Sequence, residues 1–207
     1  MRWAHWGPMP SAARLAACFA IGAVAGTLLD GLHLLGDVLS YEHEAFGEWA
    51  WFVPLEFGLA GVAAGVAIPV LERAVGPQVP PYFDTIGRVG EVVLFAALYG
   101  ATALFDGDGA VWLLVGLTLL VLVRLWLWPV PGDWAYAAIA AVVGPAAEIA
   151  ISATGAFDYA NPDFAGIPMW LPALWANGGL LIRRLLGPVV LAEHAAARPS
   201  RAPGIPG

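Results

Sequence analysis

Six long apolar segments dominate this sequence, and each is close to the length that crosses a lipid bilayer. A helix rises about 1.5 Å per residue, so roughly 20 apolar residues cross the ~30 Å hydrocarbon core. The segments lack alternation of apolar and polar residues, which favours helices over strands. The sequence therefore predicts an all-α, polytopic membrane protein with six transmembrane helices, at about residues 12–36, 51–71, 86–105, 110–129, 134–154 and 168–187.

Composition supports a lipid environment. Hydrophobic residues make up 60% of the chain and charged residues only 12%, against about 25% charged residues in ordinary soluble domains. So few charges cannot cover a surface that faces water. The net charge of −7 and the absence of lysine argue against nucleic-acid binding, which needs a basic patch for phosphates.

The arginines predict the orientation. In the six-span arrangement all nine arginines fall on one side, and the three opposite connections carry acidic residues but no Lys or Arg. The positive-inside rule then places both termini in the cytoplasm. We expect a transmembrane domain over 1–187 and, because 188–207 is rich in Ala, Pro and Arg, a disordered cytoplasmic tail. The lack of lysine and the Ala/Arg/Gly bias indicate a bacterial plasma membrane protein.

Ionisable residues within the spans are the candidates for chemistry, because a charge in hydrocarbon is costly. Asp30, His33, Glu56 and Glu148 all fall in the outer halves of their spans. Three interpretations stay open: neutral carboxyls that hydrogen-bond helices together, contacts to a lipid head group, or a metal or acid–base site. Glu91 lies near an inner end, three residues after Arg88, and we expect an ion pair between them.

Two motif blocks resemble the Insig (insulin-induced gene protein) family. The more specific block is Tyr159-x-x-Pro162-Asp163-Phe164, followed by Trp170-Leu171-Pro172, Gly178-Gly179 and Arg183. The second block comprises Trp51-Phe52-Val53-Pro54, Gly61-x-Ala63-Ala64, Pro69 and Glu72. The resemblance covers roughly residues 49–184, and it implies an Insig-like bundle of six helices with both termini cytoplasmic.

The resemblance also implies a ligand and partners. Animal Insig proteins bind oxysterols, retain the escort protein Scap and promote degradation of HMG-CoA reductase. A prokaryotic relative suggests a diacylglycerol-like lipid in a central cavity, and a homo-oligomer. The animal proteins carry an Asp-Arg pair in the connection after the fourth span, where this chain reads Trp128-Pro129-Val130-Pro131-Gly132-Asp133-Trp134. A Scap-type partner is therefore not carried over.

We predict a protein that holds a diacylglycerol-like or sterol-like lipid between its helices, as a lipid sensor or regulator, with no cofactor or metal. The alternative is an intramembrane enzyme, a lipid isomerase or hydrolase that uses His33 with Glu56 and Glu148. The expected lipid contacts are Phe52, Glu56, Glu91, Phe95, Glu148, Trp175 and Asn177.

Overall fold

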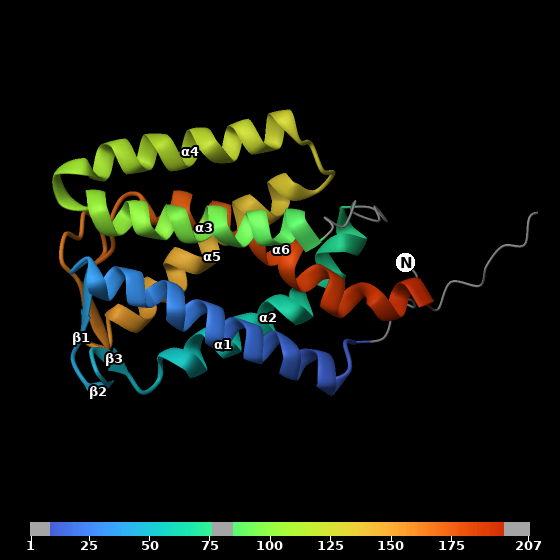
Figure 1. Ribbon diagram of the computed structural model, residues 1–207, viewed down its shortest axis with the longest axis horizontal. Helices are drawn as coiled ribbons and strands as arrows, with labels where there is room; N and C mark the ends of the chain where they lie inside the picture. Colours follow the sequence, from blue (N-terminus) through green and yellow to red (C-terminus); the bar gives the residue numbers. More distant parts are fainter. Residues whose placement is uncertain (1–8, 76–84, 197–207) are drawn as a thin grey trace, which may run out of the picture.

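Six long helices form the part of the protein that the structure describes, as the sequence predicted. The structure is a computed structural model that describes residues 9–75 and 85–196 (Figure 1). Each helix overlaps one predicted span and differs from it mainly at the ends. The helices are α1 (Ala12–Leu35), α2 (Val53–Ala74), α3 (Thr85–Phe105), α4 (Ala110–Leu127), α5 (Asp133–Ser152) and α6 (Leu171–Ala196).

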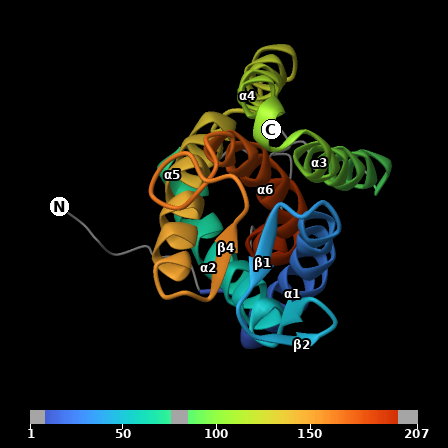
Figure 2. The ribbon, with the colours of Figure 1, turned by 90° about the vertical axis from the view of Figure 1, so that its left-hand side faces the viewer.

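Helix α6 lies in the centre of the bundle. It packs against each of the other five helices, which surround it in Figure 2. The other five helices are long and apolar enough to cross a membrane, whereas α6 is more polar because it carries Asn177, Arg183 and Arg184. Since neighbouring helices shield α6 from lipid, its polar groups find partners inside the protein.

Helix α6 also corrects the expected start of the tail. The helix continues past residue 187 to Ala196, with Pro188 inside it. Val190 is fully buried with Cys18 and Ile68, and Arg14 Nη1 donates to the carbonyl of Val189 at 2.7 Å. This packing on α1 and α2 keeps the segment helical. The rest of the expected tail, 197–207, lies outside the described residues.

The three acidic connections meet at one end of the bundle, which we call the acidic end. Short strands form there: β1 (Leu39–Tyr41), β2 (Glu44–Phe46), β3 (Trp49–Ala50) and β4 (Phe157–Tyr159). β1 pairs antiparallel with β4, and β2 with β3. Asp106, between α3 and the 3-10 helix η1 (Gly107–Gly109), accepts hydrogen bonds from Asn161 (3.0 Å) and Trp170 (2.8 Å).

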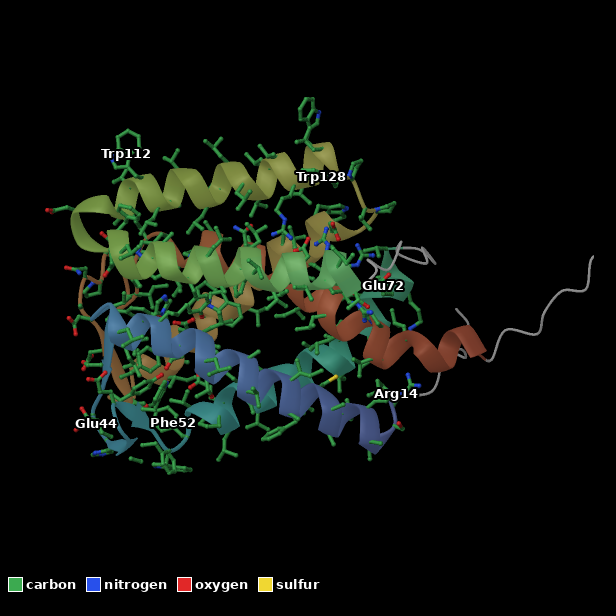
Figure 3. The ribbon with its side chains drawn as sticks, in the orientation of Figure 1. Arg14, Glu44, Phe52, Glu72, Trp112 and Trp128 are labelled. Atoms are coloured by element: carbon green, nitrogen blue, oxygen red, sulfur yellow. The ribbon has the colours of Figure 1, made fainter. Side chains whose placement is uncertain are left out.

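The opposite end, which we call the arginine end, carries the start of α1 and the end of α2. Figure 3 places Arg14 and Glu72 there, far from Glu44 and Phe52 at the acidic end. Trp112 and Trp128 mark the two ends of α4 and are 77% and 60% exposed, as tryptophans at the two membrane interfaces are. The separation of charge seen in the sequence thus holds for the described residues.

Candidate functional site

An apolar cavity lies between α1, α2, α3 and α6. It encloses ≈ 760 Å³ of space outside the protein atoms, part of which is open to the surroundings. Gly22 and Leu29 of α1, Phe57 of α2, and Phe95 and Trp175 of α3 and α6 are among its lining residues. Phe95 and Trp175 were both predicted from the sequence as lipid contacts.

A layer of polar side chains separates this cavity from the acidic end. Glu148 of α5 accepts a hydrogen bond from the indole of Trp175 at 2.6 Å and another from the hydroxyl of Tyr159 in β4. Trp175 therefore belongs to both the cavity wall and the polar layer. Both carboxyl oxygens of Glu148 are used by these donors.

Helix α1 contributes Asp30 and His33 to the same layer. Asp30, 3% exposed, accepts a hydrogen bond from the hydroxyl of Tyr41 in β1 at 2.9 Å. The Nε2 atom of His33 lies 2.8 Å from the hydroxyl of Thr102, which itself donates to the carbonyl of Tyr99 at 2.7 Å. Since the hydroxyl has one proton, His33 is the donor in its bond to Thr102.

Glu56 is the carboxyl of this layer that accepts no hydrogen bond from the described side chains. It lies in the first turn of α2, is partly buried, and is close enough to Glu148 and Asp30 for electrostatic interaction. No residue in the described ranges donates a hydrogen bond to its side chain. The predicted contact Phe52 lies nearby, with its ring packed edge-on against Tyr41 at 5.7 Å.

The layer does not form a metal site in the described part of the chain. No group of three or more His, Cys, Asp or Glu side chains is placed to hold a metal ion there. The sequence placed the four ionisable residues at one depth. The structure brings Asp30, Glu56 and Glu148 close enough to interact, whereas His33 bonds to Thr102 of α3. The tyrosines that bond to them, Tyr41 and Tyr159, come from strands that were not predicted.

A second polar group, the ion-pair chain, lies in the arginine half of the bundle. Arg183 pairs with Glu72 and Asp133, each at 2.7 Å, and Arg184 pairs with Asp133 at 2.7 Å and with Glu91 at 3.3 Å. A further ion pair joins Glu91 to Arg124 of α4. Three carboxylates and three guanidinium groups thus alternate across five helices.

This chain corrects the expected pairing of Glu91 with Arg88. The carboxylate of Glu91 instead meets Arg124 and Arg184, which are distant in sequence. Asn177 is fully buried beside them, accepts from Arg124 at 3.1 Å and donates to the carbonyl of Leu117 at 3.2 Å. Glu91 is therefore a member of the ion-pair chain, and Asn177 is hydrogen-bonded to it. Of the seven predicted lipid contacts, Phe95 and Trp175 line the cavity, whereas Phe52, Glu56, Glu91, Glu148 and Asn177 are not among its lining residues.

Comparison with known proteins identifies the family. The family model described as "Protein of unknown function (DUF2878)" matches residues 88–196, more than half of the chain. The chain belongs to the DUF2878 family. Its matched region runs from the start of α3 to the end of α6, so it contains most of the ion-pair chain and Glu148 of the polar layer.

This DUF2878 chain is also a distant homologue of the Insig proteins. It is 26% identical to insulin-induced gene 1 protein of Homo sapiens, over 79% of this chain and 61% of the human protein. The corresponding protein of Danio rerio is 26% identical over 79% of this chain and 67% of its own length. The chain thus spans less than two thirds of the human relative.

The fold is that of a solved Insig homologue. The structure of the mycobacterial Insig homologue MvINS from Mycobacterium vanbaalenii superposes with a TM-score of 0.68 at 23% identity, covering 93% of this chain and all of MvINS. A cross-linked MvINS trimer gives a TM-score of 0.69 at 23% identity, with the same coverage. The resemblance inferred from the two motif blocks is confirmed.

Proposed function

We propose that this protein binds a diacylglycerol-like or sterol-like lipid in the cavity between α1, α2, α3 and α6, as a lipid sensor or regulator. One observation carries the proposal: Trp175 in the wall of the apolar cavity bonds to Glu148 of the polar layer, in which Glu56 accepts no hydrogen bond from the described residues. Ligand sites commonly combine apolar walls with a few polar groups that orient the ligand. The Insig resemblance supports the same class of ligand.

Selectivity for such a lipid comes from its head group. Lipid tails are already in an apolar medium in the bilayer, so moving them into the cavity brings little hydrophobic gain. Hydrogen bonds to the polar layer therefore distinguish one lipid from another. A hydroxyl on the lipid would donate to Glu56 at the polar end, while the acyl or ring portion lies along Phe57, Phe95 and Ile182.

The charges of the polar layer favour an uncharged head group. Asp30, Glu56 and Glu148 supply carboxyls, and the three acidic connections above them contain no Lys or Arg. Phosphate head groups need cationic partners or other strong donors. An uncharged hydroxyl satisfies a carboxyl acceptor without bringing like charges together.

The polar layer supports binding better than catalysis. His33 and Thr102 are 2% and 0% exposed and hydrogen-bond to each other. A general base has to reach the substrate within hydrogen-bonding distance, and this histidine is covered by Tyr99, stacked at 4.4 Å, and by Trp170. We therefore place the enzyme alternative second.

We also propose an orientation and an assembly. The arginine end faces the cytoplasm of a bacterial plasma membrane, with both termini there, because arginine is retained on the cytoplasmic side. A homo-oligomer is proposed because the MvINS neighbour forms a cross-linked trimer. A Scap-type partner is not proposed.

Mass spectrometry of lipids that co-purify with the detergent-solubilised protein tests this function. We expect one uncharged lipid per chain in the wild type and roughly tenfold weaker binding in Glu56→Leu, seen as a lower lipid occupancy, since a hydrogen bond to a carboxyl contributes about 1.5 kcal/mol. Glu44→Leu changes an exposed carboxylate in β2 and should retain the lipid. Absence of stoichiometric lipid from the wild type in several mild detergents would count against the proposal.

A further inference from the structure

Helices α1 and α3 touch at the acidic end. His33 hydrogen-bonds to Thr102 and stacks on Tyr99, and Gly36 packs closely against Ala103. These contacts involve the last turns of α1 and of α3. In Figure 1 the two helices lie close together beside β1 and separate toward the arginine end, where α6 is visible between them.

The acidic end of the cavity is closed by buried groups. Val38 and Trp170 are fully buried, and Tyr159 is 6% exposed. β1 pairs with β4, and this pairing holds the connections that carry these residues over the acidic side of the polar layer. A lipid that entered from this end would have to displace the strand pair and the contact between His33 and Thr102.

The arginine half of the cavity is open toward the bilayer. The first half of α3 contributes no buried residue, and the buried residues of the helix are Tyr99 and Thr102. On α6, the lining residues Ile182 and Leu185 stay partly exposed although their neighbours are buried. Positions three apart share one helix face, so this face of α6 looks onto the opening between α1 and α3.

We infer that the lipid enters sideways from the bilayer, through the opening between α1 and α3 in the arginine half, with its polar head leading toward Glu56. This inference rests on the proposed lipid-binding function and adds the route by which the site fills. The head then passes an apolar stretch lined by Ile21, Ile182 and Leu185 before it reaches the polar layer. Moving a charge through such surroundings costs far more than moving a hydroxyl. The route itself therefore admits lipids with uncharged heads and rejects phospholipids.

Exchange kinetics test the route. The protein is placed in phosphatidylcholine nanodiscs with deuterated dioleoylglycerol, unlabelled dioleoylglycerol is added, and native mass spectrometry follows the exchange. Ile182→Trp narrows the opening, and we expect exchange at least tenfold slower than in the wild type. The matched control is Leu28→Trp, which adds the same ring to α1 at a position that is 67% exposed and outside the cavity lining. It should exchange at the wild-type rate.

A second pair of variants keeps the test decisive. If Ile182→Trp loses its helical circular dichroism signal, Leu185→Phe replaces it with the same expectation. Asp106→Ala removes the acceptor that holds Asn161 and Trp170 at the acidic end and should leave the exchange rate unchanged. A wild-type exchange rate in a folded Ile182→Trp or Leu185→Phe protein would overturn the inference, and faster exchange in Asp106→Ala would place the entrance at the acidic end.

The choice between charged and uncharged head groups is an independent test of the entry route. Dioleoyl phosphatidic acid has the same acyl chains as dioleoylglycerol and a charged head, so we expect at least tenfold lower occupancy at equal mole fraction in the nanodisc. Equal occupancy by both lipids would overturn the inference while leaving lipid binding intact. A wild-type protein that takes up neither lipid would instead refute the proposed function.

Discussion

Arg183 donates two hydrogen bonds to the carboxylate of Glu72, from Nε at 2.7 Å and from Nη2 at 3.1 Å. The two residues lie 111 positions apart, on α6 and α2. They begin a chain that continues through Asp133, Arg184 and Glu91 to Arg124. Its three positive and three negative groups cancel, so these six side chains together carry no net charge.

Removing one end of this chain should destabilise the protein strongly. Glu72→Ala leaves Arg183 with Asp133 as its remaining carboxylate partner, and breaking a buried ion pair on one side costs about 3–5 kcal/mol. Thermal unfolding in detergent, followed by circular dichroism, checks this. Glu44→Ala removes an exposed carboxylate at the acidic end and should stay close to the wild type. Equal unfolding temperatures for the two variants would contradict a stabilising role for the chain.

The position of α4 should depend on Arg124. This residue bonds to Asn177 of α6 and to Glu91 of α3, whereas much of the apolar surface of α4 is exposed. In Arg124→Met we expect amide hydrogen exchange in α4 to rise about tenfold, because hydrogen bonds to charged groups contribute about 1.5–3 kcal/mol. Peptides from α1 and α2 should be unaffected. Leu122→Met, at a position 56% exposed on the same helix, is the control; a uniform increase in all helices would argue against local release of α4.

The close packing of α1 on α2 depends on glycine. A Cβ atom at Gly61 would lie 2.3 Å from the backbone oxygen of Cys18, whereas a Cβ atom at Gly116 would meet nothing within 4 Å. Gly61→Ala should therefore destabilise the protein by about 1–3 kcal/mol through overpacking. Gly116→Ala should be neutral or stabilising by up to about 1 kcal/mol, because alanine favours a helix. Unfolding in mixed micelles of increasing SDS content measures both, and the opposite order of stability would refute this packing.

Alkaline pH should destabilise the strands at the acidic end. Burial, with the nearby carboxylate of Asp30, raises the pKa of Tyr41 above its ordinary value of 10. Burial and Glu148 likewise raise the pKa of Tyr159. Above pH 10 these tyrosines ionise in the unfolded chain but not in the folded protein. Their contribution to stability is therefore complete below pH 10 and is lost as the pH rises further.

Tyrosinate absorbance at 295 nm and the unfolding temperature between pH 8 and 11 measure this effect. Tyr41→Phe should show a smaller loss of stability over that range than the wild type. If all five tyrosines of the folded wild type ionised near pH 10, the buried environment of Tyr41 and Tyr159 would be disproved.

The spans were predictable because each depends on a continuous stretch of sequence. About 20 apolar residues in a row cross hydrocarbon whatever lies elsewhere in the chain, so the predicted spans agree with α1 to α5 to within a few residues at each end. The end of α6 was wrong because packing of Val190 beside Cys18 extends the helix. The strands β1 and β4 were missed because three-residue segments are too short to show alternation.

The candidate site was predictable in part for the same reason. Depth in the membrane follows from position in a span, so Asp30, His33, Glu56 and Glu148 were expected at one level. The three carboxyls lie close enough to interact, and His33 bonds to Thr102. Which partner each charge takes depends on how helices pack side by side. The short spacing of Arg88 and Glu91 predicted a local pair, yet Glu91 meets Arg124 and Arg184 on other helices.

The sequence by itself determined that this chain is a six-helix membrane protein of Insig type, with arginine at one end and acidic residues at the other. Hydropathy and the side on which each charge lies are properties of single segments. Only the tertiary structure decided that α6 lies at the centre, that Glu72 and Arg183 are partners, and that a cavity forms between α1, α2, α3 and α6. Those features depend on the rotation and tilt of each helix against its neighbours, which arise from packing among residues distant in sequence.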